Sequence, residues 1–150
     1  MNHDSQEEVI KRATQEDPLV MYLIVRESLG MGVGKTAAQC AHASQMLLLK
    51  YHEFFKGDVL PDVGMWLPPF SRETFELFEQ WLRGSFRKVV LKANDGEWEK
   101  IKSTFIERQR IIVIDAGLTE IEPGSETVIG LYPMRKSRAP KVIKWLRVLK

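Results

Sequence analysis

Residues 21–43, MYLIVRESLGMGVGKTAAQCAHA, decide the fold of this chain. The run LVMYLIV at residues 19–25 is continuously apolar, which predicts a strand buried on both faces. Three glycines follow at positions 30, 32 and 34, and from Lys35 good helix formers continue without Gly or Pro until Gly57. The stretch therefore predicts a strand, a glycine loop and a helix of several turns.

The glycine loop has the composition of an anion site. Glycines let backbone amides approach a ligand, the start of a helix carries partial positive charge, and Lys35 adds a full charge. The spacing differs from a P-loop, which needs glycine where this chain has Leu29, and from the dinucleotide fingerprint, which needs glycine at position 35. A glycine turn without any ligand stays as the alternative interpretation.

One face of the predicted helix carries polar side chains. Lys35, Gln39 and His42 are spaced i, i+4 and i+7, so they share that face and indicate a polar site. For His42 the alternative is a semi-buried histidine hydrogen-bonded to the backbone. The helix also contains three small residues, and we expect them to let it lie close to the sheet: Ala37, Ala38 and Ala41.

The rest of the chain alternates predicted strands and helices. Further strands are expected at residues 88–92, 110–115 and 127–132. Helices are expected from the N-cap Ser71 to about residue 84, from residue 94 or 95 to about 105, and at 139–149, where the pattern is basic and amphipathic. This order predicts a three-layer α/β domain with a mixed sheet of about four strands flanked by helices.

Length, composition and net charge limit the number of domains and the ways in which the protein can bind its partners. A length of 150 residues with 44% hydrophobic residues fits a single domain, which we place at residues 19–150 after a polar tail at 1–18. The net charge of +2 excludes binding to polyanions through bulk charge. Positive charge is instead local, because residues 134–150 hold seven basic side chains and no acidic one.

The cysteine content and the hydropathy of the sequence indicate where in the cell the protein is expected. The single cysteine, Cys40, excludes an intramolecular disulfide, and the three histidines show no zinc-type spacing, so no metal site is expected. No run approaches the roughly 20 apolar residues of a membrane span. We therefore expect a cytoplasmic protein without a membrane partner.

A second polar cluster is predicted near the last two strands. Asp115 ends an apolar strand, so its carboxylate is expected at the edge of the sheet where α/β proteins build sites, although an Asp there can also simply cap a turn. Thr127 begins the returning strand near the same edge. Lys35, Asp115 and Thr127 are therefore expected to converge.

Two blocks of sequence resemble the type 2 peptidyl-tRNA hydrolases of archaea and eukaryotes. The first block is similar to the pattern M-x-x-G-K-x-x-A-Q-C-x-H-A at Met31, Gly34, Lys35, Ala38, Gln39, Cys40, His42 and Ala43. The second is similar to D-A-G-x-T-x-x-x-P-G-x-x-T-x-x-G-x-x-P at Asp115, Ala116, Gly117, Thr119, Pro123, Gly124, Thr127, Gly130 and Pro133. Residues 57–70, which contain two Gly and three Pro, look like a loop insertion relative to the family.

The resemblance implies a function. It implies hydrolysis of the ester between a peptide and the 3′ end of tRNA, without metal or cofactor, by a protein that is commonly a homodimer. Lys35, Asp115 and Thr127 match the family's proposed catalytic residues. The positions expected to contact substrate are Gly34, Gln39, His42 and Thr119.

The chain also departs from the family pattern. Gly30, Val33 and Leu118 stand where basic residues are usual, Ser28 replaces an acid, and Glu120 replaces Gln. Phosphate contacts dominate nucleic-acid affinity, so the lost basic residues favour an alternative, a catalytically inactive member that binds RNA or protein. Nucleotide binding by a degenerate P-loop is a third hypothesis.

Overall fold

A computed structural model describes residues 5–8, 17–55, 71–117 and 121–150. The predicted loop insertion at 57–70 lies outside these residues, as does most of the predicted tail at 1–18. No helix in the described part of the chain is both long and apolar enough to cross a bilayer.

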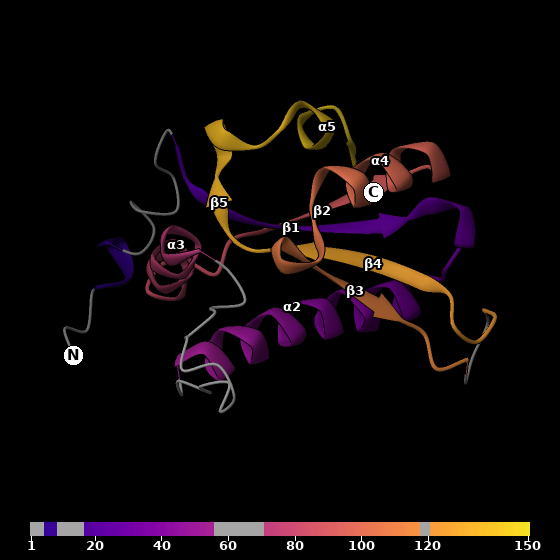
Figure 1. The fold of residues 1–150 in the computed structure, drawn as a ribbon, viewed down its shortest axis with the longest axis horizontal. Coiled ribbons are helices and arrows are strands. Elements are labelled where there is room, and N and C mark those ends of the chain that lie inside the picture. Colours follow the sequence, from indigo (N-terminus) through magenta and orange to yellow (C-terminus); the bar gives the residue numbers. More distant parts are fainter. Residues whose placement is uncertain (1–4, 9–16, 56–70, 118–120) are drawn as a thin grey trace, which may run out of the picture.

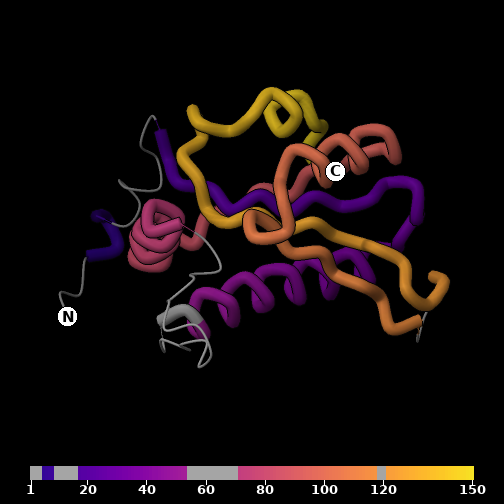
Figure 2. Tube along the Cα trace, viewed as in Figure 1, coloured from indigo at the N-terminus to yellow at the C-terminus, as the bar shows by residue number. Residues whose placement is uncertain are grey.

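The four predicted strands form the body of one mixed sheet. The strand β1 (Leu19–Arg26) pairs in parallel with β2 (Lys88–Ala93) and antiparallel with β4 (Glu126–Leu131), which also pairs antiparallel with β3 (Arg110–Ile114). Figure 2 shows β1, close to the start of the chain, lying beside β4 from near its end.

Two short strands extend this sheet beyond the four that were predicted. The strand β5 (Met134–Arg135) pairs with the start of β1, and β6 (Arg147–Val148) pairs with β2, so the sheet has six strands. Each of these strands has two residues. An alternation of apolar and polar residues cannot be recognised over so short a stretch, so the sequence did not predict them.

Helices cover both faces of the sheet, which confirms the three-layer α/β prediction. The helices α2 (Val33–Phe55) and α3 (Arg72–Leu82) lie on one side, and α4 (Asp95–Thr104) and α5 (Lys141–Lys144) on the other (Figure 1). The predicted N-cap is confirmed, because the Ser71 side chain accepts a hydrogen bond from the Thr74 amide.

The core is divided by β1. Alternate residues of this strand point to opposite faces, so it contributes to both hydrophobic clusters and is buried along almost its whole length. Toward α2 and α3 the cluster contains Leu47 and Phe78, and toward α4 and α5 it contains Trp98 and Ile143. The prediction of a strand buried on both faces is confirmed.

The prediction of a helix over residues 139–149 is wrong in extent. The helix α5 covers only Lys141–Lys144, after which Leu146 turns into the core and the chain becomes β6. The Leu149 amide donates to the Val90 carbonyl at 3.0 Å. Pairing with β2 therefore replaces the helical hydrogen bonds that the amphipathic pattern predicted.

The expected packing of the alanines on α2 is also wrong. Ala37, Ala38 and Ala41 are exposed. The residues that α2 buries are Gln39, Ala43 and Leu47, which recur every four positions. At about 100° per residue the three exposed alanines lie on the opposite side of the helix from this buried row.

Candidate active site

The centre of the candidate site is an ion pair between Lys35 and Asp115. Lys35 lies in the first turn of α2, and Asp115 follows the last residue of β3. The Lys35 Nζ donates to Asp115 Oδ1, and the two side chains are only 11% and 3% exposed. The structure thus brings together two residues 80 positions apart, as the sequence predicted.

Two further donors hold the Asp115 carboxylate. Gln39 Nε2 donates to Oδ1 at 2.8 Å, and the Gly117 amide donates to Oδ2 at 2.8 Å. The hydrogen bond from Lys35 lowers the pKa of the Asp115 carboxyl below its usual value, and the Gly117 and Gln39 donors lower it further, against the opposing effect of burial. Asp115 is therefore a stable anion and a weak base.

A tight turn fixes the backbone of Asp115. Its amide donates to the Ser125 carbonyl at 2.9 Å, and its carbonyl accepts from the Gly124 amide at 3.0 Å. Gly117 has a φ of +76°, in the left-handed region that favours glycine, and packs against Pro123. The turn therefore aims the Gly117 amide back at the carboxylate of Asp115.

Gln39 offers an acceptor beside the ion pair. Its Nε2 faces the carboxylate, because the opposite orientation would place two oxygens together. Its Oε1 is buried and has no hydrogen-bond donor among the residues that the structure describes. An unsatisfied buried acceptor costs about 1 to 3 kcal/mol, so this oxygen would gain from a donor brought by a ligand or water.

Thr127 occupies a β-bulge. The pairing between β3 and β4 shifts by one residue between Val113 and Ile114, and Thr127 is the extra residue on β4. Its side chain is fully buried, and its hydroxyl donates to the Val113 carbonyl at 3.2 Å. Within the described residues no hydrogen bond joins Thr127 to Lys35 or Asp115, so hydrogen bonding links only Lys35 and Asp115 among the three residues predicted to converge.

Comparison with known proteins decides the family. The family described as "Peptidyl-tRNA hydrolase PTH2" matches residues 19–149. The chain belongs to this PTH2 family. It is 33% identical over 132 residues to a peptidyl-tRNA hydrolase of Methanopyrus kandleri, covering 85% of this chain and 96% of that one.

Other archaeal relatives give the same result. A peptidyl-tRNA hydrolase of Methanococcus maripaludis is 33% identical over 130 residues, covering 85% of this chain and 96% of the relative. One of Saccharolobus islandicus is 29% identical over 132 residues, covering 86% and 98%. Membership of the PTH2 family assigns the chain the activity of a peptidyl-tRNA hydrolase, a carboxylic ester hydrolase.

The other predicted site residues of this PTH2 chain that the structure describes are more exposed than Lys35 and Asp115. Gly34 is exposed in the first turn of α2, with open space where a side chain would be. His42 is exposed, so it lies at the margin of the buried row and the alternative of a semi-buried histidine is wrong. Thr119 lies outside the described residues.

The charged groups around the glycine loop were not found from the sequence. Asp95 at the start of α4 accepts hydrogen bonds from Arg26 Nε at 3.1 Å and Ser28 Oγ at 2.7 Å. Glu27 pairs with Lys92 and Arg147. The neighbouring charges of Arg26 and Glu27 were the only signal in the sequence, and they do not identify these distant partners.

No described residues of this PTH2 chain form a metal site. Among residues 5–8, 17–55, 71–117 and 121–150, no group of three His, Cys, Asp or Glu side chains could hold an ion. Both oxygens of Asp115 accept from N–H donors, which differs from the metal-binding Asp that a P-loop protein needs. The arrangement instead suits the stabilisation of negative charge near Lys35.

Proposed function

We propose that this PTH2 chain hydrolyses the ester between peptide and tRNA in peptidyl-tRNA, releasing free tRNA, with Lys35 and Asp115 at the reaction centre. The observation that carries the proposal is their nearly buried ion pair at the start of α2, in a chain whose family acts on this ester. Water adds to the ester carbonyl carbon, the bond to the ribose oxygen breaks, and a proton from the water ends on that ribose oxygen.

Lys35 stabilises the negative charge that develops on the carbonyl oxygen. An ammonium group shielded from solvent interacts more strongly with an oxyanion than it would in bulk water. The start of α2 adds the partial positive charge of its free amides. Asp115 holds Lys35 in place as a stable anion, which makes orientation of the lysine and the water its main contribution.

Thr127 and the residues at the mouth of the site complete the proposal. The Thr127 hydroxyl would donate to the reacting group only after rotating away from the Val113 carbonyl. Gln39 Oε1 is an acceptor for a water or substrate donor. Substrate contacts are proposed for Gly34, His42 and Thr119, and the reaction needs neither metal nor cofactor.

The test is release of tRNA from an N-blocked aminoacyl-tRNA. Lys35→Met should lower kcat by roughly 100- to 1,000-fold, the range seen when one oxyanion donor is removed. Asp115→Asn and Thr127→Val should also lower kcat. Lys50→Met is the matched control, because Lys50 lies at the far end of α2. Full activity of the Lys35 and Asp115 variants would contradict the proposal.

A binding module is the second candidate function. Val33, where the family pattern has a basic residue, is 89% exposed beside Lys35, so the entrance lacks one expected phosphate contact. If wild-type protein at concentrations matching the substrate gives no turnover but binds tRNA, this candidate replaces hydrolysis.

We also infer a cytoplasmic location, where peptidyl-tRNA is made, and a homodimer. The absence of a membrane-spanning helix among the described residues supports the first inference, and the family resemblance supports the second. Cell fractionation and analytical ultracentrifugation test them directly.

A further inference from the structure

Trp145 is an unusually exposed aromatic residue. It follows α5, and 71% of its surface is accessible, whereas Trp81 and Trp98 are buried. Its neighbours Ile143 and Leu146 are buried at 2% and 7%, so the turn that carries Trp145 is anchored on both sides. The indole is therefore presented to solvent from a fixed position.

Several lysines in the C-terminal segment that carries Trp145 lack an acidic partner among the residues that the structure describes, although Arg147 of the same segment pairs with Glu27 and Glu97. Elsewhere the structure pairs basic side chains with acids, as in Arg26 with Asp95 and Lys102 with Glu126. No salt bridge within the described residues involves Lys136, Lys141, Lys144 or Lys150. Lys144 Nζ donates to the neutral Ser137 carbonyl at 3.0 Å, its one hydrogen bond within the described part of the chain.

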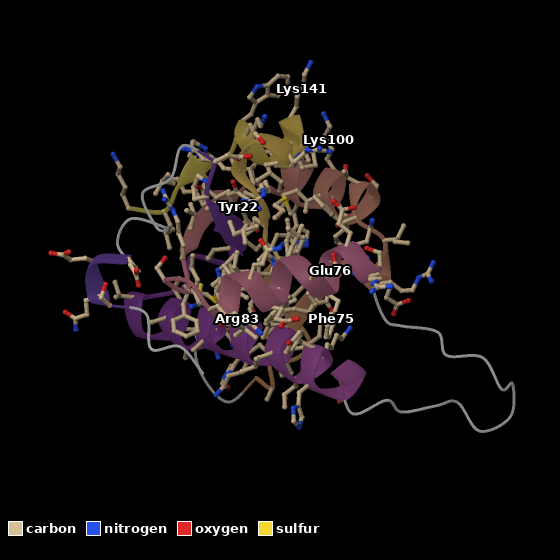
Figure 3. The ribbon with its side chains drawn as sticks, turned by 90° about the vertical axis from the view of Figure 1, so that its left-hand side faces the viewer. Tyr22, Phe75, Glu76, Arg83, Lys100 and Lys141 are labelled. Carbon is tan, nitrogen blue, oxygen red and sulfur yellow. The ribbon has the colours of Figure 1, made fainter. Side chains whose placement is uncertain are left out.

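The lysines extend onto the neighbouring helix. The helices α4 and α5 are in contact, and Lys100 of α4 and Lys141 of α5 project from the same side of the molecule (Figure 3). Both side chains belong to exposed residues. An exposed aromatic ring in a segment whose lysines form no ion pair is the combination that binds unpaired nucleotides, since the ring stacks on a base and the lysines contact the flanking phosphates.

We propose that an unpaired nucleotide of tRNA stacks on Trp145, with its flanking phosphates on Lys141 and Lys144. The inference rests on the proposed function, because it names the surface by which this hydrolase holds its substrate. It also offers a replacement for the basic residues missing beside Lys35, at Gly30 and Val33. The base can come from the single-stranded 3′ end or from a tRNA loop, which share this chemistry.

Binding of deacylated tRNA tests the surface independently of catalysis. Trp145→Ala should raise Kd about 5-fold or more without changing the salt dependence, and Trp145→Phe should restore most of the affinity. Lys141→Gln should lower the slope of log K against log salt by about 0.7 to 1, because one phosphate contact is lost. Lys50→Gln, on the other side of the sheet, should leave affinity and slope unchanged.

Truncated tRNA identifies the source of the base. If the base comes from the 3′ end, removing the terminal CCA should abolish the difference between wild type and Trp145→Ala. If it comes from a loop, the difference should persist, and both results support the surface.

Two results would overturn the inference. Wild-type affinity and salt slope in both Trp145→Ala and Lys141→Gln would exclude tRNA from this surface. A change of sedimentation in Trp145→Ala with unchanged tRNA affinity would assign the surface to a protein contact. If the proposed function is wrong but this inference is right, wild-type protein will bind tRNA through this surface without hydrolysing the ester.

Discussion

Replacing Gly117 by alanine should disturb the site through the turn that holds Asp115. A Cβ at this position would lie 2.3 Å from Pro123 Cγ and 2.7 Å from Pro123 Cα, which is part of the backbone. The left-handed φ of +76° costs an alanine about 1 to 2 kcal/mol, and the clash adds about 1 to 3 kcal/mol. We expect Gly117→Ala to lose about 2 to 5 kcal/mol in total, as the sum of these two effects.

Gly124→Ala is the matched control for this experiment. Gly124 has a similar φ of +83°, but a Cβ there meets nothing within 4 Å, so only the backbone effect of about 1 to 2 kcal/mol applies. Urea denaturation measures both losses, and ester hydrolysis by the folded proteins measures activity.

Activity should separate the two variants further. Displacing residue 117 withdraws a donor from Asp115 Oδ2, so Gly117→Ala should lose activity that Gly124→Ala retains. Equal stability and equal activity of the two variants would refute the idea that packing against Pro123 positions Asp115.

Three further predictions concern other parts of the molecule. Because the folded pKa of Asp115 is lowered from 3.8, its stabilising effect is present above that pH and is lost as pH falls through the folded pKa. The difference in unfolding free energy between wild type and Asp115→Asn should therefore shrink below pH 3.8, and a constant difference would contradict this. Phe78→Ala should cost about 3 to 5 kcal/mol by denaturation, because Phe78 is fully buried, whereas Leu49→Ala at an exposed position should cost much less. Burial raises the pKa of the Cys40 thiol, so alkylation followed by mass spectrometry should be slow in native protein and fast in urea, and equal rates would contradict the burial.

The parts of the fold that local signals encode were predicted from the sequence. The apolar run at residues 19–25 identified the central strand, and Ser71 identified the start of α3. The spacing of Lys35 and Gln39 placed both on one face of α2, where they meet Asp115. The strand, the N-cap and the shared helix face each depend on residues that are close together in the sequence, whereas the meeting with Asp115 was inferred from the order of strands and helices.

The parts that depend on distant contacts were not predictable in this way. Leu146 and Leu149 fit an amphipathic helix, yet the Leu149 amide bonds to Val90 of β2. The bulge that buries Thr127 arises from the register between β3 and β4, which no local pattern reports. In this register the Thr127 hydroxyl donates to the Val113 carbonyl, a partner that the sequence did not indicate.

The central position of β1 has a consequence for synthesis of the chain. Leu19 pairs with Arg135, which the ribosome adds 116 residues later. At a synthesis rate of about 5 to 20 residues per second, roughly 6 to 23 seconds pass between synthesis of the apolar residues 19–25 and synthesis of their last partner strand. Until β4 and β5 are made, at least one edge of this strand is incompletely paired, and the strand has the composition of an aggregation-prone segment. The nascent chain should therefore depend on chaperone protection of its N-terminal strand more than the finished enzyme does.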